Sequence, residues 1–224
     1  PAGERFQFLA GQYLEFLLKD NKRRAYSIAS APHEDGPLEL HIRHLAGGLF
    51  TDPLFGQSKD GKQLKEKDIL RFEGPLGSFF LREDSQKPII FLASGTGFAP
   101  IKAMLLHIQE KKIDRQIHFY WGGRRPNDLY MNELCEEFAQ TIKRFQYIPV
   151  VSDALAEDHW KGRTGFVHRA VMADFPDLSA HQVYACGAPI VIQSAQTDFV
   201  KECRLPEDEF FADSFTSEAD LISA

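Results

Sequence analysis

The sequence is short of cysteine, of excess basic residues and of long apolar runs, and each shortage excludes a class of protein. Its three cysteines, Cys135, Cys186 and Cys203, are too scattered for a disulfide framework or an iron–sulfur site. Their scarcity favours a reducing cytoplasm. A formal net charge of −6 argues against a nucleic-acid partner and against an anionic membrane surface. No apolar run approaches the roughly 18–20 residues that a membrane-spanning helix needs.

The composition is that of a folded protein with one or two domains. The 224 residues fit one large domain or two of about 100–130 residues. Hydrophobic residues make up 43% of the chain, and the 19 Phe among them argue against disorder. The sequence has no signal peptide and starts with Pro rather than Met, so we expect the natural chain to extend further upstream.

Residues 1–86, the N-terminal part, are rich in short β-forming segments separated by turn residues. Such spacing predicts a small all-β antiparallel barrel. Strands are expected at residues 12–18, 23–29, 38–43, 69–72 and 78–81, with a helical turn or two over residues 49–55.

The pattern changes at residues 85–87, and residues 87–224, the C-terminal part, alternate strands with helices. This alternation predicts an α/β doubly wound parallel sheet. Strands are expected at residues 89–93, 117–121, 146–151, 182–186 and 209–212, and helices at residues 100–111, 130–142, 167–174 and 189–202. The chain is therefore expected to hold two domains, 1–86 and 87–224.

One stretch of the C-terminal part has the order strand, glycine turn, helix. The apolar residues 89–93 lead into Gly95, Thr96 and Gly97, and Pro100 suits the first turn of the helix that follows. Glycines let a backbone approach a diphosphate, and a helix N-terminus presents N–H groups and positive charge to it. The alternative is a glycine turn that only connects two elements.

Three further patterns point to ligand chemistry. Arg24 and Tyr26 share one face of a strand, where a guanidinium can hold a phosphate and a ring can pack on an aromatic cofactor, with the Ser27 hydroxyl beside them. The alternative is an ordinary barrel strand. Gly47, Gly48 and Thr51 could hold a second diphosphate, or form only a capped turn.

Cys186 ends a predicted strand, just before Gly187 and Pro189. It therefore lies at the carboxyl edge of the sheet, where doubly wound folds bind ligands. Cys135 and Cys203 fall in predicted helices and fit the commoner role of a buried small thiol.

These motifs occur in one order along the chain: Arg24-x-Tyr26-Ser27, Gly48-x-x-Thr51, Gly74-Pro75-x-Gly77, Gly95-Thr96-Gly97-x-x-Pro100 and Cys186-Gly187-x-Pro189. With them the chain resembles the ferredoxin–NADP reductase superfamily of flavoproteins over nearly its whole length. The segments 120–124 and 210–215 resemble the branch of oxygenase reductases, flavin reductases and reductases of CDP-6-deoxy-glucoseen type.

The resemblance implies a role for each matching residue. Arg24 would bind the FAD diphosphate, Tyr26 would stack on the isoalloxazine, and Ser27 would approach its N5. The implied catalytic residues are Tyr26, Ser27, Cys186, Asp213 and Phe215. The implied cofactor-binding residues are Arg24, Tyr26, Ser27, Ile42, Arg43, Gly47, Gly48, Leu49, Thr51, Gly95, Thr96, Gly97, Pro100, Arg124, Asp128, Gly187 and Pro189. No metal site is expected among them.

The implied reaction passes a hydride from NAD(P)H to FAD, and then electrons to an iron–sulfur centre or to a protein acceptor of oxygenase or dehydratase type. Arg124 and Arg125 favour NADPH, whereas Asp128 suits ribose hydroxyls, and the branch resemblance favours NADH. The alternatives are a flavin reductase that releases reduced flavin and a non-catalytic nucleotide-binding module. A hydrolase is not favoured, since Cys186 has no evident His partner and Ser94 lacks a G-x-S-x-G motif.

Two departures from the family pattern carry expectations of their own. The family's barrel has six strands and five are predicted here, so the first strand is expected before Pro1. The four cysteines of a plant-type [2Fe–2S] domain are missing, so such a cluster is expected only in an upstream domain. The chain as given should then reduce ferricyanide with NADH better than it reduces a protein acceptor.

Overall fold

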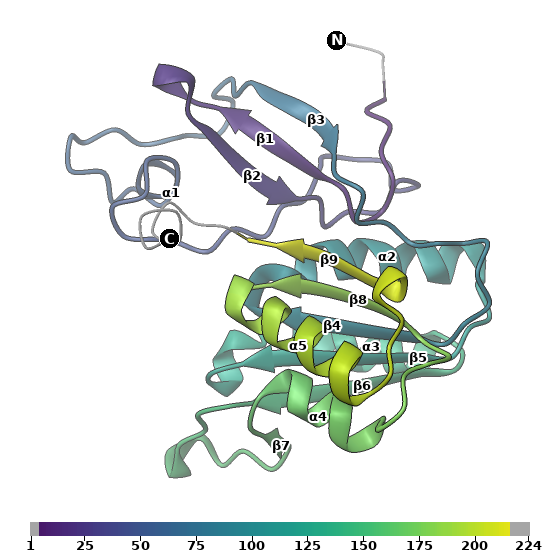
Figure 1. Ribbon diagram of the computed structural model, residues 1–224. Helices are drawn as coiled ribbons and strands as arrows, with labels where there is room; N and C mark the ends of the chain where they lie inside the picture. The colour runs from purple at the N-terminus through teal and green to yellow at the C-terminus, as the bar shows by residue number, and fades with distance from the viewer. Residues whose placement is uncertain (1–4, 216–224) are drawn as a thin grey trace.

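The computed structural model describes residues 5–215, and the two parts of the chain are built on separate sheets (Figure 1). The N-terminal part holds an antiparallel sheet of three strands in the order β2-β1-β3. These strands are β1 (Tyr13–Leu17), β2 (Arg23–Ser27) and β3 (Phe72–Leu76), with the 3-10 turn η1 (Lys19–Asn21) between the first two and the short helix α1 (Thr51–Leu54) in the long connection. The predicted antiparallel β architecture is confirmed.

Two predicted strands of the N-terminal part are wrong as regular strands, and a third, at residues 69–72, overlaps β3 only at Phe72. Residues 38–43 make one isolated bridge, between Leu40 and Ile28, and residues 78–81 belong to no sheet. The alternation that predicted the first of them is real, because Leu38, Leu40 and Ile42 pack against the small core around Leu14. That alternation reports burial on one side of an extended segment, and it does not require a hydrogen-bonded neighbour.

The C-terminal part is a parallel sheet of six strands in the order β7-β6-β5-β4-β8-β9. The strands are β4 (Ile89–Ser94), β5 (Ile117–Gly123), β6 (Phe145–Val151), β7 (Arg163–Thr164), β8 (Gln182–Gly187) and β9 (Phe210–Ser214). The helices are α2 (Phe98–Lys111), α3 (Asn132–Thr141), α4 (Val167–Asp174) and α5 (Pro189–Glu202), with 3-10 turns η2 (Gly95–Gly97), η3 (Pro126–Asp128), η4 (Ala156–Asp158) and η5 (Glu207–Glu209).

Helices cover both faces of this sheet, as a doubly wound fold requires. Phe91 on β4 packs in the core formed with α2 and α3, whereas its neighbours Ile90 and Leu92 pack in the core formed with α4 and α5. All three side chains are fully buried. This explains why residues 89–93 read as a continuous apolar run, because both faces of the strand are inside the protein. The predicted α/β architecture is confirmed.

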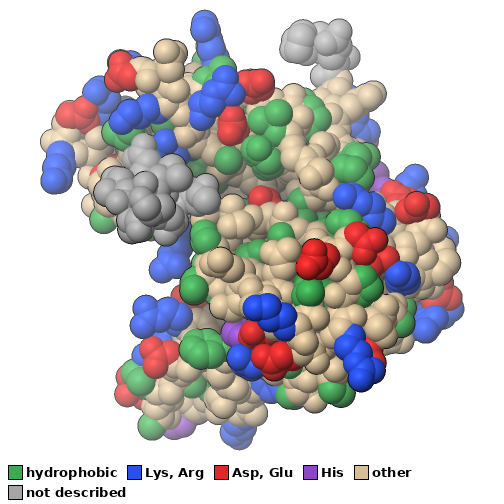
Figure 2. All heavy atoms as spheres, viewed as in Figure 1, with side chains coloured by type: hydrophobic (Ala, Val, Ile, Leu, Met, Phe, Trp, Pro, Cys, Tyr) green, Lys and Arg blue, Asp and Glu red, His purple; other side chains and the backbone are tan. Residues whose placement is uncertain are grey.

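The surface carries charges of both signs, and Figure 2 shows acidic and basic side chains interspersed over the visible face. Among the described residues, no helix is long and apolar enough to cross a membrane.

A buried arginine joins the connection between the two parts to the parallel sheet. Arg115 is 2% exposed. Its guanidinium donates hydrogen bonds to the carbonyls of Lys87 (2.7 Å) and Arg82 (3.1 Å) and to Oε1 of Gln182 (2.8 Å). A charge out of water is tolerated only when its donors are satisfied, so these contacts fix the path of residues 82–87 into β4.

We predict that Arg115→Met destabilises the protein, because the two carbonyls and the Gln182 amide lose a charged partner. The expected loss in the free energy of unfolding is about 1.5–3 kcal/mol, measured by urea denaturation. Arg144→Met is the control, since the Arg144 side chain is 51% exposed and lies 3.9 Å from Asp114. Equal urea midpoints for the two variants would contradict the role given to Arg115.

Candidate functional site

Three neighbouring strands end together at the carboxyl edge of the parallel sheet. Strands β4, β8 and β9 pair in register, with Cys186 opposite Ala93 on one side and Asp213 on the other. Figure 1 shows β9 at the edge of this sheet nearest to the antiparallel sheet. There Ser27, the last residue of β2, donates a hydrogen bond from Oγ to Oδ2 of Asp213 (3.3 Å). The structure thus brings together Ser27, Cys186 and Asp213, which are implied catalytic residues.

Burial sets the protonation of this group. Cys186 is fully buried, and this desolvation raises the pKa of its thiol well above the ordinary value, so the thiol is neutral at neutral pH. Burial also raises the pKa of Asp213, and the hydrogen bond from Ser27 only partly opposes that shift. Cys186 is therefore suited to shape a site rather than to attack a substrate.

Two glycine loops interlock beside these residues. A Cβ on Gly97 would lie 2.0 Å from the carbonyl oxygen of Cys186, and a Cβ on Gly187 would lie 2.7 Å from Cβ of Ser94. Only glycine lets the two backbones approach so closely. Gly95 adopts a positive φ of +55°, and the space where its Cβ would point is open for 4 Å. This contact between two backbones was not predicted, and the predicted approach of a diphosphate to Gly97 stays a prediction.

The turn η2 runs directly into α2, so one helical run begins at Gly95. The first N–H groups of such a run have no partner within the helix, and they lie at its positive end. Helix α2 begins at Phe98, two residues before the predicted start, and Pro100 sits in its first turn, where its missing N–H costs nothing. The cradle formed by these glycines fits a diphosphate.

Trp121 supports this loop and was missed by sequence reasoning. Its indole Nε1 donates a hydrogen bond to the Gly95 carbonyl (3.0 Å), and its ring stacks on Phe98 with 4.3 Å between centroids. The signal available in the sequence is an aromatic residue near the end of a buried strand, which is far commoner as core.

Arg24 and Tyr26 share one face of β2, as predicted. Both residues are half-buried, whereas Arg23, which precedes Arg24, and Ala25, which lies between Arg24 and Tyr26, are exposed. The Tyr26 ring packs against Phe50, with centroids 5.5 Å apart, and burial raises its pKa, so the phenol is neutral. Arg24 donates a hydrogen bond to the Arg23 carbonyl (2.7 Å).

The loop that contains Gly47, Gly48 and Thr51 uses much of its own hydrogen-bonding capacity. Thr51 Oγ1 donates to the Leu45 carbonyl (2.9 Å), and the Gly47 N–H donates to Oδ2 of Asp52 (3.0 Å). The prediction that this loop holds a diphosphate stays a prediction, and a bound diphosphate would compete with Asp52 for the Gly47 N–H. Gly47 has φ +82° with open space beside it, whereas a Cβ on Gly48 would lie 2.3 Å from Thr51 Oγ1.

The structure also places the other predicted residues, which belong to the N-terminal part or follow β8. Half-buried Ile42 packs on the small core of the N-terminal part, whereas Arg43 and Leu49 are exposed. Pro189 opens α5, directly after the Gly187 loop, and the Phe215 N–H donates to the Gly187 carbonyl (3.0 Å).

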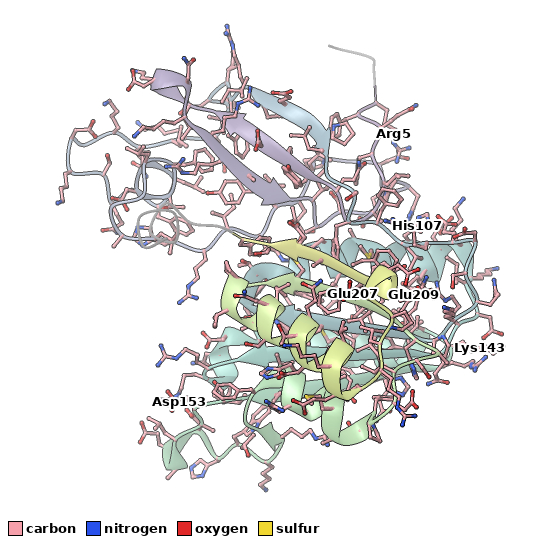
Figure 3. All side chains as sticks on the ribbon, viewed as in Figure 1. Arg5, His107, Lys143, Asp153, Glu207 and Glu209 are labelled. Carbon is pink, nitrogen blue, oxygen red and sulfur yellow. The ribbon has the colours of Figure 1, made fainter. Side chains whose placement is uncertain are left out.

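Arg124, Arg125 and Asp128 form a turn after β5, two strands away from β8 in the sheet. Oδ2 of Asp128 accepts hydrogen bonds from the N–H groups of Arg124 and Arg125, both at 2.9 Å. The Arg124 guanidinium pairs with Asp153 (3.3 Å), which Figure 3 labels in the loop beyond β6, and Arg125 pairs with Asp158 (2.9 Å). Both guanidinium groups therefore already have an acidic partner.

Sequence reasoning also missed Lys102, a buried lysine on α2 whose Nζ donates to Oε2 of Glu39 in the N-terminal part (2.7 Å). The available signal was a charged residue inside the apolar segment that begins α2. Within residues 5–215, no group of three or more His, Cys, Asp or Glu is placed to hold a metal ion.

We predict that Gly97→Ala destabilises the C-terminal part, because the new Cβ meets the Cys186 carbonyl and must push two backbones apart. The expected loss is about 1–3 kcal/mol, measured by urea unfolding of the purified variant. Unchanged unfolding would show that the loop does not lie against β8 as described.

Each part of the chain matches a family of known proteins. Residues 2–81 match the family model of the oxidoreductase FAD-binding domain, and residues 91–197 match that of the oxidoreductase NAD-binding domain. The chain is 43% identical to the CDP-6-deoxy-L-threo-D-glycero-4-hexulose-3-dehydrase reductase of Yersinia pestis over 96% of its length, and it spans 62% of that relative.

Other relatives show the same likeness. Identity is 37% to the reductase component 1 of terephthalate 1,2-dioxygenase from Comamonas sp, over 97% of this chain and 62% of that one. It is 32% to the NAD(P)H-flavin reductase of Aliivibrio fischeri, over 93% of this chain and 86% of that one. The crystal structure of an Amycolatopsis cytochrome P450 reductase superposes with a TM-score of 0.84 at 30% identity, over 96% of this chain and 63% of that one. The chain belongs to the ferredoxin–NADP reductase superfamily of flavoproteins.

Proposed function

We propose that this chain is an oxidoreductase that takes hydride from NAD(P)H onto FAD and passes the electrons onward. The observation that carries the proposal is the meeting of Ser27 with Asp213, beside Cys186, where the FAD-binding and NAD-binding parts face each other. We propose residues 1–86 and 87–224 as the two domains. The two family matches, which end at residue 81 and begin at residue 91, support that boundary.

The residues present fit both cofactors. The half-buried guanidinium of Arg24 suits the FAD diphosphate, and the neutral ring of Tyr26 on the same strand face suits a flat aromatic system. The glycine cradle from Gly95 to Gly97 suits the diphosphate of the nicotinamide dinucleotide. When bound, FAD and the nicotinamide supply the hydride acceptor and the hydride donor.

The chain's own residues would then position the nicotinamide and hold a proton near the flavin. The thiol of Cys186 is neutral and fully buried behind the backbone of this edge, so it places no charge beside a nicotinamide that packs against Gly187. Ser27 Oγ hydrogen-bonds Asp213, whose raised pKa makes its carboxyl a better proton store than an exposed aspartate. A proton can therefore move between Asp213 and the Ser27 hydroxyl at the flavin side. Phe215, beside Gly187, would help to exclude water.

NADH is the proposed donor rather than NADPH. A 2′-phosphate needs an arginine with charge to spare, and both Arg124 and Arg125 are paired with aspartates. Asp128 adds a carboxylate to the same turn, which disfavours a phosphate and suits ribose hydroxyls.

The proposed electron acceptor is an iron–sulfur centre or a protein of oxygenase or dehydratase type. Relatives named as reductase components of a dehydrase and of a dioxygenase support this choice. We also propose a cytoplasmic location, which the three free, buried cysteines support. The second candidate is a flavin reductase that releases its product, favoured by the match that spans 86% of the Aliivibrio fischeri enzyme.

An absorption spectrum of the purified protein, taken before and after anaerobic NADH, tests the proposal. We expect a bound yellow flavin that NADH bleaches. A colourless protein that consumes added flavin as a substrate would favour the second candidate. A protein whose bound flavin is bleached by neither NADH nor NADPH would be a nucleotide-binding module and would contradict both.

We predict that Arg24→Ala weakens FAD binding. It removes a charge-assisted contact worth roughly 1.5–3 kcal/mol, which is about tenfold or more in affinity. Titration of the apoprotein with FAD measures the change. Arg23→Ala is the control, since Arg23 is exposed on the opposite face of β2 and pairs with Glu15 (3.0 Å). An Arg24→Ala variant that holds FAD as tightly as the control would refute the assignment.

Cys186→Ala is expected to retain FAD and to slow anaerobic flavin reduction in stopped flow, because the backbone beside the nicotinamide loses the buried thiol that packs behind it. Cys135→Ala is the matched control, since Cys135 is equally buried but lies on α3 in the core. Both variants lose one buried sulfur, so a slow rate in Cys186→Ala alone isolates the site. Parent-like reduction by Cys186→Ala would remove Cys186 from it.

A further inference from the structure

A second polar connection crosses the junction between the two parts, separate from the contact of Ser27 with Asp213. It starts at Lys102 in the early turns of α2, the helix that follows the glycine cradle. The side chain is 8% exposed, and its Nζ donates to Oε2 of Glu39 (2.7 Å) and, at 3.4 Å, to the carbonyl of Ala29. Figure 1 shows α2 on the side of the parallel sheet that faces the N-terminal part.

The connection continues from Glu39 back into the C-terminal part. Oε1 of Glu39 lies 2.8 Å from Nε2 of His41, and Nδ1 of His41 lies 2.7 Å from the hydroxyl of Tyr130. A carboxylate only accepts, so Nε2 carries the proton that His41 donates, and Nδ1 accepts the Tyr130 hydroxyl proton. The polar groups of these side chains are thereby matched, donor to acceptor.

This connection contacts two elements of the candidate site, the end of the flavin strand β2 and Trp121 beside the nucleotide cradle. Ala29 lies two residues after Ser27, and its N–H donates to the Glu39 carbonyl (2.8 Å). Tyr130 presents its ring edge-on to Trp121, with centroids 5.1 Å apart, and Trp121 holds the Gly95 carbonyl. The flavin strand and the nucleotide cradle are therefore joined through named side chains.

The connection forms only when the two parts sit at one separation. A buried ammonium left without its carboxylate is strongly unfavourable, so Lys102 and Glu39 hold α2 against residues 29–41. The short contact between Nδ1 of His41 and the hydroxyl of Tyr130 adds a second, directional constraint, because it joins residues 89 positions apart in the chain. His41 also packs its ring against Phe98, the first residue of α2, with 6.0 Å between centroids.

We propose that Lys102, Glu39, His41 and Tyr130 form an interdomain relay that positions the nucleotide cradle against the flavin strand for hydride transfer. The inference rests on the proposed function. Hydride transfer requires reacting atoms about 3–3.5 Å apart, so a small shift between the two parts costs rate without removing a contact to either ligand. These four are positioning residues.

The test uses two relay variants, Glu39→Gln and Tyr130→Phe, each with a matched control. Glu83→Gln removes the same charge from a pair with His107 (2.9 Å), which lies on α2 as Lys102 does and is labelled in Figure 3. The Glu39 and Glu83 side chains are similarly exposed, at 45% and 52%. Tyr147→Phe removes a hydroxyl that donates to Oδ1 of Asn132 (2.9 Å) inside the C-terminal part.

Stopped flow of the FAD-loaded proteins with NADH gives the limiting rate of bleaching and the apparent affinity for NADH. We expect the limiting rate to fall about fivefold or more in both relay variants, with NADH affinity within about twofold of the parent and FAD retained. The double variant should be no slower than the slower single one, because the groups act as a unit. Both controls should match the parent, and Tyr130→Phe is small enough to keep the fold.

Relay variants that bleach as fast as their controls would overturn the inference and leave the proposed function intact. So would variants that lower the unfolding temperature while the limiting rate stays at the parent value, since that is the signature of a structural contact alone. A parent protein that neither NADH nor NADPH bleaches would overturn the proposed function together with this inference.

Discussion

The close contact between two glycine loops is the constraint on which the rest of the site depends. Gly97 lies against the Cys186 carbonyl and Gly187 against Ser94, with no room for a side chain at either glycine. This contact brings the start of α2 to the end of β8, so the positive end of a helix and a buried neutral thiol share one edge of the sheet. Strand β9 then adds Asp213 in register with Cys186.

The second requirement is a fixed junction between the two parts of the chain, and three groups of contacts supply it. Ser27 reaches Asp213 at the site itself. Lys102 reaches Glu39 beside it. Arg115 holds the connecting segment at a distance from both. Each is a polar contact of at least one buried group, and such contacts specify one geometry because a mispaired buried polar group is costly. Apolar packing alone would tolerate more variation in the angle between the parts.

The sequence predicted the parallel sheet and its carboxyl edge well, and the antiparallel part less well. Residues 89–93 are apolar on both faces, a pattern that few other environments produce. By contrast, the alternation over residues 38–43 predicted a paired strand, but it reflects burial of one side of an extended segment. For Thr51 the sequence left two alternatives open, a diphosphate contact or a capped turn; its hydroxyl donates to the Leu45 carbonyl within its own loop, as in a capped turn, and the diphosphate contact stays a prediction. The pairing of Lys102 with Glu39 spans 63 residues, and composition and periodicity carry no signal for such a partner.

The central claim is that the two parts meet in one geometry that passes a hydride directly between the two cofactors. The most direct measurement is stopped-flow bleaching of the FAD-loaded protein with NADH deuterated at C4 on one face or on the other. A rigid site that holds the nicotinamide on a single face should show slower bleaching with deuterium at one of the two positions and an unchanged rate at the other. Equal bleaching rates for undeuterated NADH and for both deuterated forms, with the bleaching step itself limiting, would contradict direct transfer in this site.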